Sequence, residues 1–391
     1  MMISEISGTN FTSLVKEYPT RIMRAKALMA ERDLDGLLLI TGANLAYFTG
    51  MPCEKSGSRP FVYILPQGGE PILIVQDGRQ FEASLFTKIS DIRTYSRLSH
   101  LPFETVEGAL KDRGLLTGRI GVELGGEMVM DIPFSDYIEL QNRLPEVSFE
   151  DASPLLWQLR MIKSQAEIER IAGACTITME AYGRTFGMVE AGMRESEIQR
   201  IMICQMLELG GGSPWVLITS GQGNYDLVSK SGGDRLVQPG DMIWMDCGCQ
   251  VEGYYSDFGR AGVVGGASKE QEEAQRAIQQ ITRQAIKMLQ PETPVAEVAS
   301  YCNTAVADLK FPVTSNISGL ASRVGHGLGM AVTELPSLSE GDSSELEAGM
   351  VVTIEPGVAT QYGTFHIEEN VVITDKGPQV LTEGHGQLWT I

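Results

Sequence analysis

Five side chains in the second half of the chain are of the types that bind divalent metal ions: Asp246, Asp257, His326, Glu355 and Glu368. One imidazole and four carboxylates suit a pair of ions such as Mn²⁺, Co²⁺ or Zn²⁺. Two ions held close together share a water molecule and activate it for hydrolysis. Each residue taken alone also fits an ordinary turn or strand end. The five together predict a two-metal site.

The predicted local structure explains how these side chains would meet. Residues 242–246 are predicted to form an apolar strand that ends on Asp246, and a turn at 251–253 would fold Asp257 back towards it. His326 lies between glycines, which let backbone and ligand approach closely. Residues 351–355 and 366–374 are also predicted strands, and they carry Glu355 and Glu368. A carboxylate in such an apolar strand needs a partner, because an uncompensated buried charge is destabilising.

The same half of the chain contains strong helix signals. Capping boxes from Ser164 to Glu167 and from Ser268 to Gln271 predict two helix starts, and the second helix should end at Pro291. Thr293-Pro294 predicts a third start, with proline at the first helical position. Helices combined with hairpin-linked strands, including one at 215–219, predict an α+β domain.

The first 150 residues show a different alternation. Residues 19–33 have apolar side chains at helical spacing. Short apolar runs at 36–41, 61–65, 72–75 and 119–123 predict buried strands. This pattern predicts a small α/β domain. A break near 151–163 divides the chain into an N-terminal domain, 1–155, and a catalytic domain, 156–391.

The composition excludes several classes of function. The chain has 391 residues and a net charge of −19, which disfavours binding to nucleic acid because phosphate backbones would be repelled. The first residues lack the pattern of a signal peptide, and no apolar run is long enough to span a membrane. We therefore expect a cytoplasmic protein. Its six cysteines should be free thiols in a reducing compartment.

The motifs around these residues resemble metallopeptidase family M24, whose catalytic domain has the pita-bread fold. The resemblance rests on the eleven-residue step from Asp246 to Asp257, GHG around His326, IEPG around Glu355 and IEEN around Glu368. The first half resembles the N-terminal domain of the creatinase, prolidase and aminopeptidase P branch, in ERDLDGLLLITGANLAYFTG and LRMIKSQAEIERI. The likeness covers nearly the whole chain.

The resemblance implies a role for each ligand. Asp246 would bind one ion, Asp257 and Glu368 would bridge both, and His326 and Glu355 would complete the other. Glu355 would also help to move a proton of the activated water. The resemblance further implies a homodimer that acts on a small molecule or a short peptide.

Three positions depart from the family pattern. Peptidases of this branch carry additional histidines where this chain has Ser229, Ser322 and Thr333. Those histidines orient the substrate carbonyl and carry protons. The main hypothesis is therefore a dinuclear metal-dependent hydrolase that cleaves an amide or other C–N bond of a small, possibly non-peptide substrate. We keep Thr333 as a candidate substrate-binding residue.

Further residues could serve the substrate. His366 lies two residues before Glu368, so both side chains would share a face of a strand. His366 is a candidate catalytic residue that donates a proton to the leaving group; alternatively it holds a ligand carboxylate. Arg323 is a candidate for binding a substrate carboxylate, or else a surface residue. Trp215 is a candidate for the pocket wall, or else a core residue.

Other functions on the same fold remain open. A genuine Xaa-Pro dipeptidase or aminopeptidase P is the first alternative. A lyase that acts on dimethylsulfoniopropionate is the second. The lyase branch of the family carries an additional Asp two residues after the first ligand, and this chain has Gly248 there, which counts against the lyase. A binding protein with a vestigial site is disfavoured, because all five ligand positions are retained.

Overall fold

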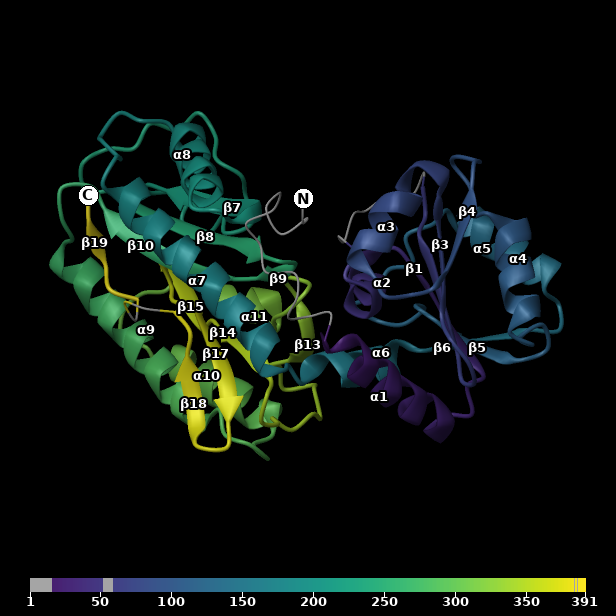
Figure 1. The fold of residues 1–391 in the computed structure, drawn as a ribbon. Coiled ribbons are helices and arrows are strands. Elements are labelled where there is room, and N and C mark those ends of the chain that lie inside the picture. Colours follow the sequence, from purple (N-terminus) through teal and green to yellow (C-terminus); the bar gives the residue numbers. More distant parts are fainter. Residues whose placement is uncertain (1–15, 52–58, 383, 385) are drawn as a thin grey trace. The chain divides into compact units, whose positions relative to one another are not determined.

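The computed structural model describes residues 16–51, 59–382, 384 and 386–391. Its backbone contacts separate into two compact units, Met1–Arg160 and Met161–Ile391. Figure 1 shows a sheet with flanking helices in the first unit and several sheets with long helices in the second. No helix in the described part of the chain is long and apolar enough to span a membrane.

The first unit is built around one six-stranded sheet with the strand order β4-β3-β2-β1-β5-β6. β1 pairs antiparallel with β2 and parallel with β5, so the sheet is mixed. The strands are β1 Gly36–Ile40, β2 Val62–Pro66, β3 Ile72–Gln76, β4 Asp91–Tyr95, β5 Arg119–Val122 and β6 Ser148–Asp151. The helices are α1 Tyr18–Glu31, α2 Gly42–Thr49, α3 Gln80–Phe86, α4 Phe103–Asp112, α5 Phe134–Arg143 and α6 Ser153–Met161. The α/β prediction for this region is confirmed.

Three sheets form the framework of the second unit. The first has the order β19-β10-β8-β7, with β9 attached to β8, and the second has the order β13-β12-β14-β17-β18. The third contains β11, β15 and β16. The first sheet comprises β7 Gly212–Ser220, β8 Met242–Val251, β9 Tyr254–Tyr255, β10 Phe258–Val263 and β19 Trp389–Thr390. The other two comprise β11 Ser315–Asn316, β12 His326–Gly327, β13 Glu334–Ser337, β14 Val351–Ile354, β15 Gly357–Thr360, β16 Gly363–His366, β17 Glu369–Thr374 and β18 Gly377–Val380.

Helices cover these sheets on two sides. α7 (Gln165–Phe186) packs on β8 and α8 (Glu195–Glu208) on β7, whereas α9 (Lys269–Met288) packs against β14, β16 and β18 (Figure 1). α10 (Val295–Ala307) lies along α9, and the short α11 (Ile317–Ala321) lies against β15. Ile278 of α9 and Val298 of α10 pack with Val352, Ile354 and Val371 in one buried cluster. The α+β pita-bread prediction is confirmed.

The local signals in the sequence correspond to most element boundaries in this unit. Both capping boxes form, at Ser164 before α7 and at Ser268 before α9. The predicted start at Thr293 was wrong by one residue: Pro294 occupies the N-cap with extended backbone and no side-chain cap bond. The preceding loop is instead held by the bridge that Pro294 forms with Glu345.

The hairpin between the two aspartates forms at the predicted turn. Val251 pairs with Tyr254 across a two-residue loop, Glu252 and Gly253, and both loop residues have positive φ, as a tight hairpin of this twist requires. The predicted single strand at 366–374 was wrong. β16 ends at His366 and β17 begins at Glu369, so the chain passes from one sheet to another at Ile367.

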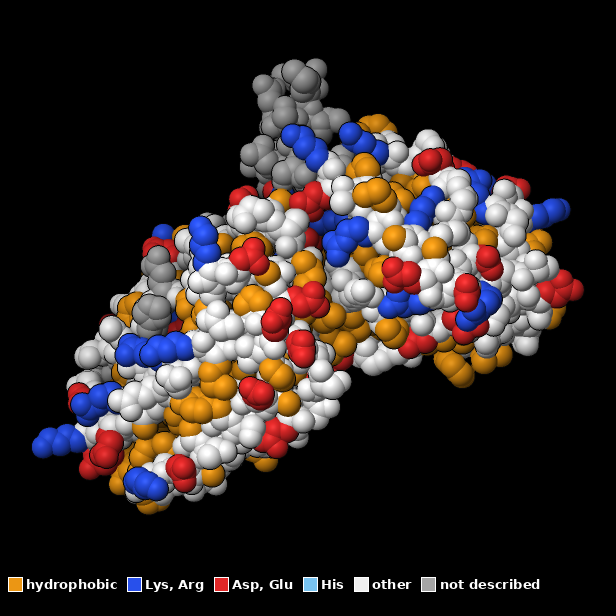
Figure 2. Space-filling view, turned by 90° about the horizontal axis from the view of Figure 1, so that it is seen from below, with side chains coloured by type: hydrophobic (Ala, Val, Ile, Leu, Met, Phe, Trp, Pro, Cys, Tyr) orange, Lys and Arg blue, Asp and Glu red, His pale blue; other side chains and the backbone are white. Residues whose placement is uncertain are grey.

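Side chains of different character are mixed on the face seen in Figure 2. Lys and Arg side chains lie there among acidic and apolar ones, so the described part of this face shows no continuous basic surface. The described cysteines are free thiols, and Cys53 lies outside the described residues. All but one of them are buried: Cys175, Cys247, Cys249 and Cys302 are buried and Cys204 is exposed.

Candidate metal centre

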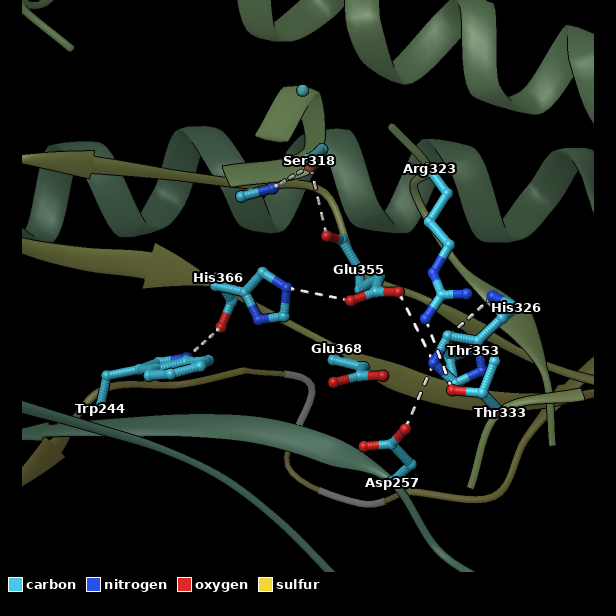
Figure 3. A network of polar contacts seen from close by, with 12 residues as sticks. Trp244, Asp257, Ser318, Arg323, His326, Thr333, Thr353, Glu355, His366 and Glu368 are labelled. Atoms are coloured by element: carbon cyan, nitrogen blue, oxygen red, sulfur yellow. Dashed lines mark hydrogen bonds and ion pairs between the residues drawn. The ribbon is translucent and has the colours of Figure 1, made fainter. Parts of the chain in front are cut away.

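The five predicted ligands come from two different sheets, one from the middle of a strand and four from strand ends. Asp246 lies within β8 and Asp257 directly before β10, in the first sheet. His326 begins β12, Glu355 follows β14 and Glu368 precedes β17, in the second. Figure 3 shows the side chains of Asp257, His326, Glu355 and Glu368 turned towards one another. The folding of these sheets therefore gathers residues that are up to a third of the chain apart.

The distances identify two overlapping groups of possible ligands. Ligand atoms of Asp257, His326 and Glu368 lie within 4.8 Å of one another, and so do those of Glu355, His366 and Glu368. His326 Nε2 is 3.3 Å from Asp257 Oδ2 and 3.8 Å from Glu355 Oε1. Glu368 belongs to both groups, which is the position expected of a carboxylate shared by two ions.

The tautomer of His326 is fixed by its own backbone neighbourhood. Its Nδ1 lies 2.9 Å from the carbonyl oxygen of Gly327. A carbonyl can accept but not donate, so Nδ1 carries the proton in the neutral ring and Nε2 presents its lone pair. Nε2 is the atom that faces Asp257 and Glu355. This is the arrangement that orients an imidazole as a metal ligand.

Several carboxylate oxygens at this centre are buried without a partner. Asp246 Oδ1 and both oxygens of Glu368 have no hydrogen-bond donor within reach. Glu368 is 1% exposed and Asp257 3%. Buried ionised carboxylates are normally paired or bound to a metal, because desolvation without compensation is costly. The donor set therefore fits divalent cations, which would supply the missing positive charge.

The pKa values of these acids are displaced in the same sense. Burial raises the pKa of Asp246 and of Glu368 well above the usual range, and the charge of Asp257 raises both further. Burial also raises the pKa of Asp257, although the contact with His326 opposes this. Without bound cations, burial therefore disfavours the simultaneous ionisation of these three carboxyl groups. Binding of divalent ions would release protons from it.

Glu355 has a different electrostatic setting. Burial alone would raise its pKa, but the hydrogen bond with His366 and the charge of His326 lower the pKa below the ordinary value. His366 Nε2 is 3.3 Å from Glu355 Oε2. Ser318 Oγ donates to the Glu355 carbonyl oxygen at 3.4 Å and so holds the backbone at this point (Figure 3). Glu355 thus stays ionised and contacts two imidazoles.

His366 is held by close packing. Trp244 Nε1 donates to the His366 carbonyl oxygen at 3.1 Å, and the two rings meet edge to face with centroids 5.3 Å apart. Gly357 is the strand partner of His366, and a Cβ there would lie 2.5 Å from the imidazole. Gly259 approaches the same ring, with a Cβ position 3.2 Å from Nδ1. The glycine of the IEPG motif therefore makes room for this histidine.

A cavity of about 520 Å³ opens onto the candidate centre. Asp246, Glu355 and His366 are among its polar lining residues, and so are Ser229 and Lys230. Its walls are mostly apolar, formed by Leu217, Val228, Trp244, Ile317 and Leu320 among others. The cavity therefore gives a molecule of modest size access to the ligands.

The other predicted substrate residues have different positions. Arg323 Nη2 is 3.5 Å from Thr333 Oγ1, and both side chains lie beside His326 (Figure 3). Trp215 pairs with Gly248 across β7 and β8, and its buried Nε1 has no hydrogen-bond partner. Among the described residues, Trp215, Arg323, Thr333 and Ser322 do not line the cavity, whereas Ser229 does.

Sequence reasoning missed some residues that shape the centre. Trp244 lies two residues before Asp246 in β8, and that alternation could have placed its side chain on the ligand face. Asn370 follows Glu368 by two residues and forms hydrogen bonds with the backbone of Asp257. No local signal could have found that contact, since it joins segments 113 residues apart.

Two family models match the chain. The model described as metallopeptidase family M24 covers residues 169–375. The model described as the creatinase/prolidase N-terminal domain covers residues 21–162. The first match alone includes more than half of the chain.

Curated relatives and solved structures agree with these matches. The chain is 26% identical over 373 residues to the Xaa-Pro dipeptidase of Pyrococcus furiosus, covering 94% of this chain and 99% of the relative. It is 24% identical over 371 residues to that of Pyrococcus horikoshii, with 94% and 98% covered. The structure of the Xaa-Pro dipeptidase from Bacillus anthracis superimposes with a TM-score of 0.83 at 21% identity, covering 96% of this chain and 100% of that one. The structure of the prolidase from Thermococcus sibiricus also gives a TM-score of 0.83, at 25% identity, covering 96% of this chain and 99% of that one. The chain therefore belongs to metallopeptidase family M24, as a metal-dependent hydrolase with a creatinase/prolidase-type N-terminal domain.

Proposed function

We propose that this protein is a dinuclear metal-dependent hydrolase that cleaves the amide bond of a dipeptide-sized substrate. The observation that carries the proposal is the meeting of buried carboxylates and imidazoles in two overlapping groups that share Glu368, next to a cavity lined by Asp246 and Glu355. In our assignment the ligands are Asp246, Asp257, His326, Glu355 and Glu368. Asp257 and Glu368 would each help to hold both ions; for Glu368 this is supported by its place in both ligand groups.

When bound, the ion pair would polarise the scissile carbonyl and lower the pKa of a water molecule. Glu355 accepts the proton of that water, since it faces the cavity and stays ionised through its contacts with His366 and His326. His366 Nε2, 3.3 Å from Glu355 Oε2, then holds or passes the proton towards the leaving nitrogen. Trp244 and Gly357 keep the imidazole in this orientation.

The substrate class that we favour is an Xaa-Pro dipeptide. The relatives named Xaa-Pro dipeptidase cover almost the full chain, and they support this alternative better than the non-peptide substrate of our main hypothesis. The apolar wall that includes Val228, Ile317 and Leu320 suits a proline ring. Lys230, which lines the cavity and forms an ion pair with Glu195, would bind the free carboxylate, whereas Arg323 does not line the cavity.

A small non-peptide amide is the second candidate substrate. One observation favours it: Ser229 lines the cavity at a position where a histidine is expected in the peptidases of this branch. Serine cannot carry a proton at neutral pH in the way that an imidazole does. Loss of the histidine would slow the cleavage of a peptide more than the cleavage of an amide that has a better leaving group.

The two substrate classes can be separated with one panel. Protein saturated with Mn²⁺, Co²⁺ or Zn²⁺ would be assayed with Ala-Pro and Gly-Pro, with Ala-Ala as a control, and with small non-peptide amides. We expect turnover of the proline dipeptides that is abolished by chelation and by Asp257→Asn. Turnover confined to non-peptide amides would reject the dipeptidase assignment. Hydrolysis that persists in Asp257→Asn would reject the proposed centre.

A further inference from the structure

We propose that Asn370 and Arg260 form a reciprocal clamp that sets the spacing of Asp257 and Glu368, the two carboxylates assigned as bridging ligands. Each clamp residue belongs to the segment of one ligand and binds the backbone of the other. The inference rests on the proposed function, because it concerns how the chain holds its metal pair. Both clamp residues act through the ligands and are therefore positioning residues.

Asn370 holds the backbone of Asp257 from both sides. The Asp257 amide N donates to Asn370 Oδ1 at 3.1 Å, and Asn370 Nδ2 donates to the Asp257 carbonyl oxygen. Asn370 is fully buried and Asp257 is 3% exposed. One carboxamide thus satisfies both polar groups of the ligand's peptide backbone, as a neighbouring strand would.

Arg260 holds Glu368 from the opposite direction. Arg260 lies in β10, three residues after Asp257, and its Nη1 donates to the Glu368 carbonyl oxygen at 2.8 Å. Its Nη2 donates to Glu369 Oε2 at 2.8 Å, and the Thr382 hydroxyl donates to Glu369 as well. The ion pair is buried on both sides. A guanidinium with several directed bonds has little freedom to move, so the Glu368 backbone is fixed in turn.

The sheets alone do not fix the spacing of these two ligands. β10 and β17 belong to different sheets, and no ladder of backbone hydrogen bonds joins them among the described strands. Asp257 and Glu368 each lie one residue before their strand, where the ladder has ended. The side-chain bonds of Asn370 and Arg260 therefore take the place of a ladder between the two ligand segments.

A third residue fixes the direction of the carboxamide. Cys175 of α7 lies with Sγ 3.2 Å from Asn370 Oδ1. Burial raises the pKa of this thiol far above its usual value, so it stays protonated and donates. Asn370 Oδ1 thereby receives two donors, from Cys175 and Asp257, and its amino group must face the Asp257 carbonyl.

The test uses Mn²⁺, because a bridged Mn²⁺ pair gives an exchange-coupled electron paramagnetic resonance spectrum and separate ions do not. The variants are Asn370→Ala, which removes both bonds to Asp257, and Arg260→Lys, which keeps the charge but loses the forked geometry. At equal occupancy we expect the coupled signal to give way to that of isolated ions. Changes to groups that orient metal ligands typically weaken affinity by about 10- to 100-fold, and we expect that loss for the weaker ion.

Matched controls separate positioning from general destabilisation. Gln271→Ala removes a buried carboxamide that is also hydrogen-bonded to backbone groups, those of Ser268, Gly240 and Tyr362. None of these three residues is an assigned metal ligand. We expect it to lower the melting temperature without altering the Mn²⁺ spectrum. Cys175→Ser keeps a donor towards Asn370, so it should behave like the unmodified protein, whereas Cys175→Ala should weaken the coupling.

The outcomes distinguish the clamp from the proposed function. If the unmodified protein binds fewer than two Mn²⁺ ions, the proposed function fails and the clamp with it. If it binds a coupled pair and Asn370→Ala and Arg260→Lys do so equally well, the clamp alone is wrong. The clamp is also wrong if Gln271→Ala disturbs the spectrum as much as those two variants do. Should Asn370→Ala not fold, Arg260→Lys and the Cys175 variants decide.

Discussion

Glu355 stands between two imidazoles and is in contact with each. His326 Nε2 lies 3.8 Å from one carboxylate oxygen and His366 Nε2 lies 3.3 Å from the other. The tautomer of His326 directs its free lone pair to the ligand cluster, whereas His366 faces the cavity. In the proposed mechanism the two histidines have separate tasks: His326 would complete the ligand set, and His366 would serve the reaction.

The first prediction concerns His366→Ala. Proton transfer by a positioned side chain contributes about 10²- to 10⁴-fold to a rate, so kcat should fall by about 100-fold or more while the metal content stays unchanged. Steady-state kinetics together with metal analysis measure both quantities. His100→Ala is the matched control, because His100 is half-exposed and contacts Asp136 in the first unit. A kcat within a few-fold of the unmodified protein would remove His366 from the mechanism.

At the scale of elements, two facing strands hold that histidine in place. Gly357 in β15 pairs with His366 in β16, and the absence of a side chain at Gly357 leaves space for the imidazole. The IEPG motif thus supplies a candidate ligand, Glu355, and at Gly357 the space that the His366 ring occupies. A side chain added at Gly357 should therefore disturb His366 without altering a candidate ligand.

The second prediction concerns Gly357→Ala. Its Cβ would lie 2.5 Å from the His366 ring, and overpacking of this kind typically destabilises by about 1–3 kcal/mol. We expect lower stability and a kcat close to that of His366→Ala. In the double variant the new methyl group occupies vacated space, so the two effects should be clearly non-additive. Gly341→Ala, which meets no atom within 4 Å, is the control. Strict additivity in the double-mutant cycle would contradict this packing argument.

Much of this element structure could be predicted from local sequence. The capping boxes at Ser164 and Ser268 and the tight turn at Gly253 are formed by contacts within a few residues, so a short window contains the information. The break between His366 and Glu369 could not be predicted, because it depends on which sheet each half of the segment joins. Local patterning fixes strands but not their partners.

At the scale of the whole molecule, the pattern of candidate ligands could be predicted from the sequence. The contacts that hold these residues in place could not. The order and spacing of the five candidate ligands can be read from the sequence itself. The contacts of Asn370 with Asp257 and of Arg260 with Glu368 span more than a hundred residues and depend on the packed fold. The cavity wall likewise combines Leu217, Val228 and Ile317 from distant segments. Such neighbours are set by tertiary structure.

The third prediction concerns the first unit. Glu123 is buried there, bonded to Asn44 Nδ2 and the Ile40 amide, and burial raises its pKa to about 7. The folded chain holds this proton more tightly than the unfolded chain. The resulting stabilisation is therefore full below the unfolded pKa near 4.5 and is lost as the pH rises through about 7.

Glu123→Gln removes that titration. Between pH 5 and pH 8 the unmodified protein should lose about 2–3 kcal/mol of unfolding free energy relative to the variant, since one pKa unit corresponds to about 1.4 kcal/mol. Denaturant unfolding at several pH values, followed for the first unit, measures the difference. Parallel pH profiles for the two proteins would show that Glu123 does not titrate in this range.

The central claim is that Asp246, Asp257, His326, Glu355 and Glu368 hold two divalent ions, and metal stoichiometry tests it most directly. Purified protein would be stripped with a chelator, titrated with Mn²⁺, Co²⁺ or Zn²⁺ by calorimetry, and analysed for bound metal. We expect two ions per chain, and fewer than two in Glu368→Gln, because Glu368 belongs to both ligand groups. A chain that binds no divalent ion, or a Glu368→Gln variant that binds two ions with unchanged affinity, would contradict the claim.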